Sequence, residues 1–508
     1  VTRHAVIAID GPAGTGKTYA IAGLFLRLIV EKRMAPSDIL VVTYTVAATE
    51  ELRDRIRRMI REALDVLAGK ATDKRFLADF AGGLADPKDA RDRLREALRG
   101  FDEAPIFTIH SFCRRMLSEN AFESGSPFDT ELLPDERALR EEIVRDFWRR
   151  HFYEAPPEFV LYARERFEGP ASFLALLRAA PFRHDARILP EAPPAVLAGL
   201  GALREAFAGL RRSWPKSRAG VEKAFRDGAL NKTKYGKPDR YLEAMDAFLA
   251  RPWAALPLSE DLAKFYPDTL AAAVKKNCKA PTHRFFERFG DFRNAVRTSS
   301  GEMEGHVRFL RCELFRFVRQ ELAVRKRRRN LRSYDDLLSD LRSALQSEGS
   351  GILSGAIRKK YRAALVDEFQ DTDPVQFAIF ESAFGQGDTT LFLIGDPKQA
   401  IYSFRGADLF AYIRAASYVQ RRYTLTENWR AEPGLVRAVN TLFGRPQHPF
   451  LYEAVPYEKA RAAVREAPSL TIGGRAEPPL KLWALDGCGE TISAERARER
   501  IRRAVAAE

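Results

Sequence analysis

The chain has 508 residues, of which 45% are hydrophobic and 30% are charged. A wholly disordered chain is excluded by this composition, and at roughly 150 residues per domain the length predicts about three to four structural units. Lysine and arginine total 83 against 69 acidic residues, and the net charge of +14 favours a polyanionic partner. The alternative is a soluble protein that is merely basic, which charge alone does not exclude.

The sequence shows no sign of membrane insertion or export. No stretch approaches the ~18 uncharged apolar residues of a transmembrane helix. Residues 1–4 lead straight into a strand-like run, without the cleavage site of a signal peptide. The four cysteines, Cys113, Cys278, Cys312 and Cys488, are widely spaced and form no metal-type pair. We therefore expect a reduced, cytoplasmic protein that makes no membrane contact.

The two ends of the chain suggest a piece of a longer protein. The first residue is not methionine, and a helical pattern beginning near residue 494 runs to residue 508 without a glycine or proline stop. We expect the chain to be an N-terminal fragment.

The first predicted elements alternate between strands and helices. A short apolar run at 5–9 is followed by a glycine-rich turn and a helical pattern at 19–30, and a second buried-strand run covers 39–43. An amphipathic helix follows, with its apolar face formed by Leu52, Ile56, Met59, Ile60 and Leu64. This alternation predicts an α/β fold with a parallel sheet.

The pattern changes in the middle of the chain. Between residues 116 and 330 strand-like runs are scarce and helical patterns are separated by proline-rich joints. Buried-strand runs return at 363–366 and 391–394. We predict one α/β domain formed by 1–115 plus 331–422, a mostly helical insertion at 116–330, and the start of a further, truncated unit at 423–508.

The segment 11–18 carries a phosphate-binding pattern. Its residues, Gly11, Pro12, Ala13, Gly14, Thr15, Gly16, Lys17 and Thr18, match G-x-x-x-x-G-K-[ST] between a predicted strand and a predicted helix. Backbone N–H groups of such a loop surround phosphate oxygens, and the helix N-terminus favours the anion. We predict that Lys17 contacts the β- and γ-phosphates and that the Thr18 hydroxyl binds Mg²⁺. The alternative, a chance glycine-rich turn, is disfavoured by an eight-residue match in this context.

Two carboxylates end a later strand. Asp367 and Glu368 directly follow the apolar run 363–366. A phosphate-binding loop enzyme needs one acid to hold Mg²⁺ and a base to orient the attacking water. Asp367 suits the first role and Glu368 the second, whereas without the loop such a pair would more often be a solvated strand end.

These segments resemble motifs of superfamily 1A DNA helicases, the UvrD/Rep group. The run 367–372 resembles their DExx box, 395–407 their third motif, and Asn428-Trp429-Arg430 their fourth, while 43–52 and 107–113 resemble two early DNA-contacting motifs. Within the group, 107–124 and 393–410 are most similar to the RecB branch, the beta subunits of exodeoxyribonuclease V. An AddA-like or UvrD-like helicase is the alternative. The resemblance covers the insertion at 116–330 only weakly.

The resemblance implies a RecA-like motor domain that binds ATP and Mg²⁺. It implies that Gln399 senses the γ-phosphate, that Arg430 reaches the γ-phosphate as an arginine finger, and that Trp429 stacks on adenine, where a tyrosine is more usual. The nucleotide site would then comprise Gly11, Ala13, Gly14, Thr15, Gly16, Lys17, Thr18 and Trp429.

The resemblance also implies contacts with DNA. Tyr402 and Phe404 match aromatics that stack on bases, and stacking tolerates any sequence. Thr43, Thr45, Thr108 and His110 match residues that contact single-stranded DNA. Taken alone, Tyr402 or Phe404 would usually be a core or surface aromatic, and His110 a structural histidine. Their assignment to DNA binding depends on the motifs around them. The basic runs at 216–240 and 325–329 either contact DNA phosphates or form solvated faces or helix ends.

Some family features have no match here. We find no glutamine motif before the phosphate-binding loop, no fifth or sixth motif and no nuclease constellation, so no nuclease activity is assigned and weak turnover is expected of this chain alone. The leading hypothesis is a RecB-type ATP-dependent translocase and helicase in double-strand break repair and recombination. It would act on single-stranded and forked DNA with RecC-like and RecD-like subunits. The alternatives are a nucleotide- and DNA-binding fragment without useful turnover, and an unrelated ATPase, which the motif order disfavours.

Overall fold

The computed structural model describes residues 5–124, 130–179, 187–189, 197–347, 350–401, 408–464, 471–485 and 491–507. The chain forms two compact units. We call residues 1–129 with 334–508 the sheet unit, and residues 130–333 the helical unit. This organisation confirms the predicted α/β class with a large helical insertion. None of the described helices is long and apolar enough to cross a membrane.

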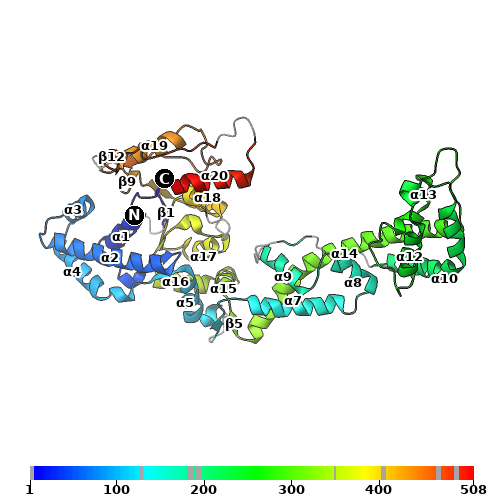
Figure 1. Ribbon diagram of the computed structural model, residues 1–508. Coiled ribbons are helices and arrows are strands. Elements are labelled where there is room, and N and C mark those ends of the chain that lie inside the picture. Colours follow the sequence, from blue (N-terminus) through cyan, green and yellow to red (C-terminus); the bar gives the residue numbers. More distant parts are fainter. Residues whose placement is uncertain are drawn as a thin grey trace. The chain divides into compact units, whose positions relative to one another are not determined.

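The sheet unit is built on a six-stranded parallel sheet among the described residues, in the order β3-β2-β6-β7-β1-β8 (Figure 1). The strands are β1 Ala5–Asp10, β2 Ile39–Thr43, β3 Ile106–Thr108, β6 Ala363–Val366, β7 Thr390–Gly395 and β8 Arg421–Thr424. All four strands that the sequence predicts are therefore confirmed. Because the strands are parallel, their carboxyl ends meet at one edge, and segments hundreds of residues apart become neighbours there.

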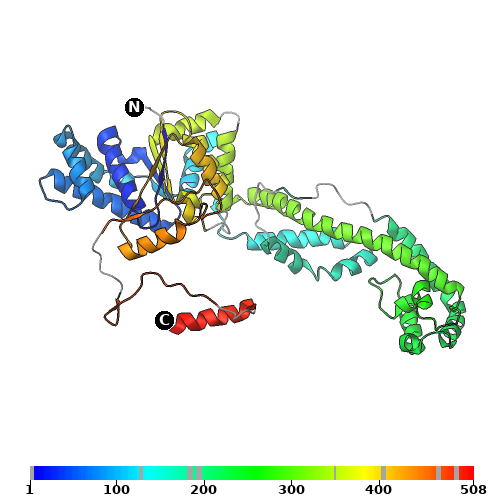
Figure 2. The same ribbon diagram turned by 90° about the horizontal axis from the view of Figure 1, so that it is seen from above.

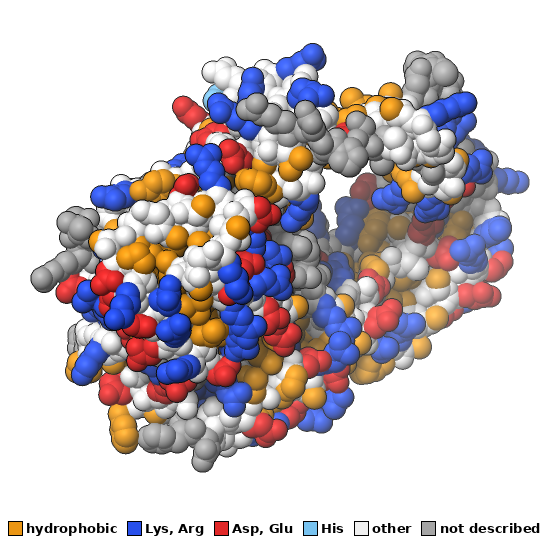
Figure 3. Space-filling view, turned by 90° about the vertical axis from the view of Figure 1, so that its left-hand side faces the viewer, with side chains coloured by type: hydrophobic (Ala, Val, Ile, Leu, Met, Phe, Trp, Pro, Cys, Tyr) orange, Lys and Arg blue, Asp and Glu red, His pale blue; other side chains and the backbone are white. Residues whose placement is uncertain are grey.

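Helices cover both faces of this sheet (Figures 1 and 2). Successive strand residues point to opposite faces, and Val41, Leu365 and Ile394 pack into one core with apolar residues of the first helices. That layer contains α1 Lys17–Lys32, α2 Val46–Leu67, α3 Arg75–Gly82 and α4 Pro87–Arg99. The opposite layer contains α5 Ile109–Glu119, α15 Tyr334–Gln346, α16 Ser350–Lys360 and α17 Pro374–Phe384. Charged side chains of both signs are interspersed on the face of the sheet unit shown in Figure 3.

The C-terminal part of the sheet unit is less buried. It contains α18 Leu409–Tyr418, β9 Glu427–Asn428, α19 Pro433–Phe443, β10 Arg461–Ala462, β11 Thr471–Ile472, β12 Arg475–Ala476 and α20 Ala494–Ala507. β9 pairs with β10, whereas α20 has no buried residue. Position 423, where we expect a further unit to begin, falls inside β8, which pairs with β1. The division into motor domains stays a prediction.

The helical unit is organised by α14 Arg284–Arg328, a helix of 45 residues that runs along the unit (Figure 2). Around it lie α7 Arg137–Phe152, α8 Pro157–Arg164, α9 Pro170–Ala179, α10 Gly199–Arg226, α11 Lys232–Tyr235, α12 Pro238–Leu249 and α13 Pro267–Ala271. Its core is rich in aromatic side chains, among them Phe147, Phe265 and Phe289, each fully buried. This apolar content explains how the insertion forms its own compact core.

The insertion enters and leaves at one place. β4 Glu131–Leu132 pairs with β5 Leu331–Arg332, so the two ends of the helical unit lie side by side. The expected start at residue 116 falls inside α5, whose Phe112 stacks on Phe380 of α17 at a centroid distance of 6.2 Å. Thus α5 is held by the core of the sheet unit, and the helical unit begins at residue 130.

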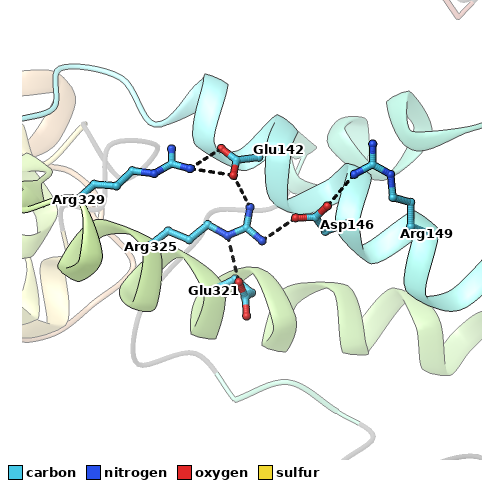
Figure 4. Close-up of polar contacts among 6 residues, drawn as sticks. All are labelled: Glu142, Asp146, Arg149, Glu321, Arg325 and Arg329. Carbon is cyan, nitrogen blue, oxygen red and sulfur yellow. Dashed lines mark hydrogen bonds and ion pairs between the residues drawn. The ribbon is translucent and has the colours of Figure 1, made fainter.

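The basic run at 325–329 is largely engaged in ion pairs within the helical unit (Figure 4). Arg325 contacts Glu142 at 2.8 Å, Asp146 at 2.7 Å and Glu321 at 3.0 Å. Arg329 also contacts Glu142 at 2.8 Å. These cations join the C-terminal end of α14 to α7, which fits the helix-end alternative for Arg325 and Arg329. Arg327 and Arg328, by contrast, are exposed.

Lys326, in the same run, is 6% exposed and its Nζ lies 2.7 Å from Oε1 of Glu136. Burial by itself would raise the pKa of Glu136, but the hydrogen bond and charge of Lys326, with those of Arg140, lower this pKa to about 2. A carboxyl whose pKa is depressed on folding stabilises the fold above its unfolded pKa and loses that contribution as pH falls. The contribution of Glu136 is thus present above about pH 4.5 and declines toward pH 2.

We expect Glu136→Gln to lower the unfolding free energy at pH 7 by about 2 kcal/mol, because the buried ammonium group of Lys326 loses the carboxylate that lies 2.7 Å from its Nζ. The difference from the wild type should shrink between pH 4.5 and pH 3, as measured by urea unfolding. Glu141→Gln is the matched control, since Glu141 lies 3.9 Å from an Arg145 side chain that is 64% exposed. Equal losses in the two variants would contradict the assignment.

Candidate nucleotide-binding site

The loop between β1 and α1 has the conformation that its glycines permit. Gly14 and Gly16 have φ angles of 80° and 87°, a region that other residues rarely adopt. A Cβ on Gly14 would also lie 2.7 Å from Cβ of Arg430. The Thr15 hydroxyl donates to the carbonyl of Pro12 at 2.7 Å and closes the turn. The loop ends at Gly16, directly before α1 begins. The free N–H groups at the N-terminus of a helix favour an anion.

Neighbouring segments hold this loop in place. Gly11 N donates to the carbonyl of Gly395 at 3.0 Å, at the end of β7, and Trp429 N donates to the carbonyl of Gly14 at 2.8 Å. The Asn428 amide donates to the carbonyl of Ala13 at 2.9 Å. The segment 428–430 is thus attached directly to the loop, which brings Trp429 and Arg430 to the same site.

The two predicted carboxylates lie beside the loop. Asp367 follows β6, and its N–H donates to the carbonyl of Val42 in β2 at 2.9 Å. Oε2 of Glu368 is 3.4 Å from Nζ of Lys17. Glu368 has a φ of 48°, a left-handed conformation that costs about 1–2 kcal/mol in a non-glycine residue and is typical of functional sites. The predicted loop lysine and acidic pair are therefore brought together.

Asp367 is in a setting that makes its charge costly. Burial, and then the negative charge of Glu368, raise the pKa of Asp367 to about 6. A bound cation would offset both effects, because it favours the ionised carboxylate. The environment of Asp367 therefore fits a metal ligand.

The third-motif residues form a polar cluster at the end of β7. Asp396 is 2% exposed, and its carboxylate accepts from the Gln399 amide at 2.7 Å and pairs with Lys398 at 2.7 Å. The amide of Gln370 bridges this cluster to the acidic pair. It donates to Oε2 of Glu368 at 2.7 Å and accepts from Asp396 N at 2.9 Å. Sequence reasoning missed the roles of Gln370 and Asp396, although both lie within recognised motifs.

A second missed cluster lies behind the loop. Asp10, the last residue of β1, is 4% exposed and contacts the Tyr412 hydroxyl and Nε of Arg422. Burial and the neighbouring Asp10 raise the pKa of Tyr412, so its hydroxyl stays protonated and donates. A carboxylate ending a buried strand was a visible signal, but its partners are 402 and 412 residues away in sequence.

The other predicted side chains are distributed as follows. Trp429 is 63% exposed, and Arg430 is also exposed. Thr43 is 3% exposed, and its hydroxyl lies 3.0 Å from that of Thr49, so it orders the start of α2. Tyr402 and Phe404 lie outside the described residues.

Thr45 and Thr108 cap two helices at the edge where β2 and β3 end. The Thr45 hydroxyl accepts from Ala48 N at 3.1 Å, and that of Thr108 accepts from Ser111 N at 3.3 Å. The His110 ring meets the Tyr334 ring edge to face at 5.4 Å, and burial lowers the pKa of His110. The roles of all these residues in DNA binding stay predictions.

The residue set suits a nucleotide with Mg²⁺ rather than a metal held by protein alone. Among the described residues, no group of three or more His, Cys, Asp or Glu could hold a metal ion. Mg²⁺ commonly takes one or two protein ligands and completes its shell with phosphate oxygens and water. Thr18 and Asp367 are the side chains that would supply the protein share.

Comparison with known proteins agrees with this geometry. The RecBCD enzyme subunit RecB of Escherichia coli (strain K12) is 35% identical over 95% of this chain and 42% of the relative. Its counterpart in Haemophilus influenzae is 33% identical over 88% of this chain and 40% of the relative. The RecB subunit of Mycobacterium tuberculosis (strain ATCC 25618 / H37Rv) is 30% identical over 85% of this chain and 29% of the relative. The chain thus spans less than half the length of these relatives.

A family model covers most of the chain. The model of the UvrD/REP helicase N-terminal domain matches residues 2–247 and 255–420. That match contains the phosphate-binding loop, the acidic pair and the third motif, the same segments that meet at the carboxyl edge of the sheet. The chain therefore belongs to the UvrD/REP helicase family.

Proposed function

We propose that the protein is an ATP-dependent single-stranded DNA translocase and helicase of the RecB type, acting in double-strand break repair and recombination. The observation that carries the proposal is the 3.4 Å contact between Lys17 and Glu368. This contact joins the phosphate-binding loop to the acidic pair, the two halves of an ATP-hydrolysing site, although they are 351 residues apart in the sequence. The three relatives of 30–35% identity, all RecB subunits, favour this branch over AddA-like or UvrD-like helicases.

Each side chain has a chemical role in this proposal. Lys17 neutralises charge on the β- and γ-phosphates, and Thr18 with Asp367 holds Mg²⁺. Glu368 orients the attacking water and accepts its proton. Bound Mg²⁺–ATP supplies the phosphoanhydride bond whose hydrolysis drives movement. Gln399 and Arg430 contact the γ-phosphate, and Trp429 stacks on adenine.

The DNA-binding part of the proposal rests on the edge where the strands end. Thr43 and Thr108 are the last residues of β2 and β3, and His110 lies in α5 after β3. Thr45 caps α2 after β2. We propose that these four residues contact single-stranded DNA, and that Tyr402 and Phe404 stack on its bases. We propose that the motor domain comprises residues 1–129 plus 334–422 of the sheet unit, that the helical unit is the insertion, and that 423–508 is the start of a second motor domain.

The proposed setting follows from the relatives and the cysteines. The relatives are named as subunits of a RecBCD enzyme, so we propose RecC-like and RecD-like partners for this protein. Cys113, Cys278 and Cys312 are free thiols, which supports a reducing, cytoplasmic location.

ATP hydrolysis with and without single-stranded DNA tests the function. The expected result for the whole protein is turnover that DNA stimulates strongly, and for residues 1–508 alone it is weak turnover. Binding of nucleotide and DNA with negligible turnover would support the alternative of a binding fragment. Absence of both binding activities would overturn the proposal.

The helical unit offers a candidate contact for forked DNA. A groove of about 590 Å³ between α10 and α14 is lined by Arg212, Lys216, Arg284 and Arg288, with Glu205 and Asp291 as its acidic residues. All four cations are exposed, and none is in an ion pair with another described residue. We propose that this groove contacts phosphates of the duplex arm.

We expect the double variant Arg212→Glu, Arg288→Glu to bind forked DNA about tenfold more weakly, because two phosphate contacts become repulsive. Its affinity should also depend less steeply on salt, in a fluorescence-anisotropy titration at several ionic strengths. Lys223→Glu is the control, an exposed lysine of α10 that does not line the groove. An equal loss in the control variant would count against a specific contact.

A further inference from the structure

A buried side-chain amide links the acidic pair to the third motif. Gln370 is 3% exposed. Its Nε2 donates to Oε2 of Glu368 at 2.7 Å, and its Oε1 accepts from the backbone N–H of Asp396 at 2.9 Å. Burying an amide is costly unless its donor and acceptor are both satisfied, and here each end has one partner.

The chemistry of the two partners sets the orientation of this amide. A reversed amide would place its carbonyl oxygen against the Glu368 carboxylate and its NH₂ against the N–H of Asp396, so both contacts would become repulsive. Gly395 allows the close approach. A Cβ at that position would lie 2.6 Å from Oε1 of Gln370 and 3.2 Å from its backbone N.

The bridge acts on one oxygen of Glu368. Oε2 receives the Gln370 amide and lies 3.4 Å from Nζ of Lys17. Among the described residues, no donor is bonded to Oε1, and the Glu368 side chain is 41% exposed. Two groups therefore fix the carboxylate through Oε2, and Oε1 is left available to water.

The other end of the bridge leads toward the segment predicted to bind DNA. The Asp396 carboxylate accepts from the Gln399 amide at 2.7 Å. A continuous series of polar contacts thus runs from Lys17 through Glu368, Gln370 and Asp396 to Gln399. The predicted base-stacking residues begin at position 402, directly after this series. A shift of the 396–399 turn would change the position of the Asp396 N–H and hence of Gln370.

We infer that Gln370 is a positioning residue that orients Glu368 and makes this orientation depend on the third motif. The inference rests on the proposed ATPase function. Gln370 does not touch the reacting atoms itself. It acts through a carboxylate, and small misplacements of such a group are costly for the rate.

The test measures ATP hydrolysis by the whole protein with and without single-stranded DNA. For Gln370→Met, which preserves volume but removes both hydrogen bonds, we expect kcat at saturating DNA to fall about tenfold or more. The ratio of stimulated to basal kcat should fall too, while KM for ATP and the Kd for DNA change by less than about twofold, as expected for a contact that acts on turnover rather than on binding. A second variant, Gln370→Glu, keeps the acceptor for the Asp396 N–H but places a carboxylate beside Glu368. We expect it to lower kcat and the stimulation ratio to a similar extent.

Gln376→Met is the matched control. Gln376 is a buried glutamine at 5% exposure, and it caps α17 through Asp373 without contacting Glu368. Equal losses in the Gln376 and Gln370 variants would overturn the inference, as would an unchanged stimulation ratio or a raised KM with unchanged kcat. An inactive wild-type protein would instead overturn the proposed function, and the inference with it.

Discussion

Replacing Glu368 by glutamine is expected to reduce the rate of ATP hydrolysis by about a hundredfold or more while nucleotide binding persists. The amide has nearly the shape of the carboxylate but cannot accept a proton from water. Loss of the negative charge 3.4 Å from Nζ of Lys17 leaves that lysine free to contact phosphate. Binding of nucleotide should therefore be equal to or tighter than that of the wild type.

Single-turnover hydrolysis and titration with a fluorescent nucleotide separate these two effects. Glu381→Gln is the control, because it makes the same chemical change outside the site. Glu381 is an exposed residue of α17. A Glu368→Gln variant with near wild-type turnover would show that another group serves as the base.

Replacing Lys17 by alanine should impair both ATP hydrolysis and nucleotide binding. We expect hydrolysis to fall by about two orders of magnitude or more, because the ammonium group stabilises charge on the transferring phosphoryl group. Unlike Glu368→Gln, this variant should also bind nucleotide more weakly. The folded state should survive, because Glu368, the partner left behind, is 41% exposed and can be solvated.

The informative measurements are nucleotide affinity, DNA-stimulated hydrolysis and single-stranded DNA binding in one preparation. DNA binding should persist in Lys17→Ala, since none of the predicted DNA contacts involves the loop. Lys32→Ala at the opposite end of α1 controls for the loss of a lysine from the same helix. Normal hydrolysis by Lys17→Ala would refute the assignment of the loop.

The pair of variants also distinguishes the proposed helicase from a binding fragment. Both readings predict that Lys17→Ala weakens nucleotide binding. Only an active motor has a DNA-stimulated rate that Glu368→Gln can remove. Comparison of the two variants therefore tests the chemistry separately from the binding.

Local sequence was sufficient for four of the six strands of the described sheet and for the phosphate-binding loop. The runs 39–43 and 363–366 are strands with those same bounds, because continuous apolar runs of this length suit a strand covered on both faces. The loop was equally visible, since its glycines permit left-handed backbone at positions close together in sequence. Recognition of the acidic pair depended on its place at the end of an apolar strand.

Tertiary structure alone decided which distant residues meet. The sheet order places β7 and β8 on either side of β1, and this order brings Arg422 to Asp10 and Gly395 to Gly11. The sequence left the basic run at 325–329 open between a DNA contact and a structural role, and only the packing of α7 supplied carboxylates for Arg325 and Arg329. The sequence did not predict the Gln370 bridge either, because its partner Asp396 comes from a different strand end. A polar side chain's partners depend on how strands and helices are assembled, and short-range sequence patterns carry no information about contacts between segments that only folding brings together.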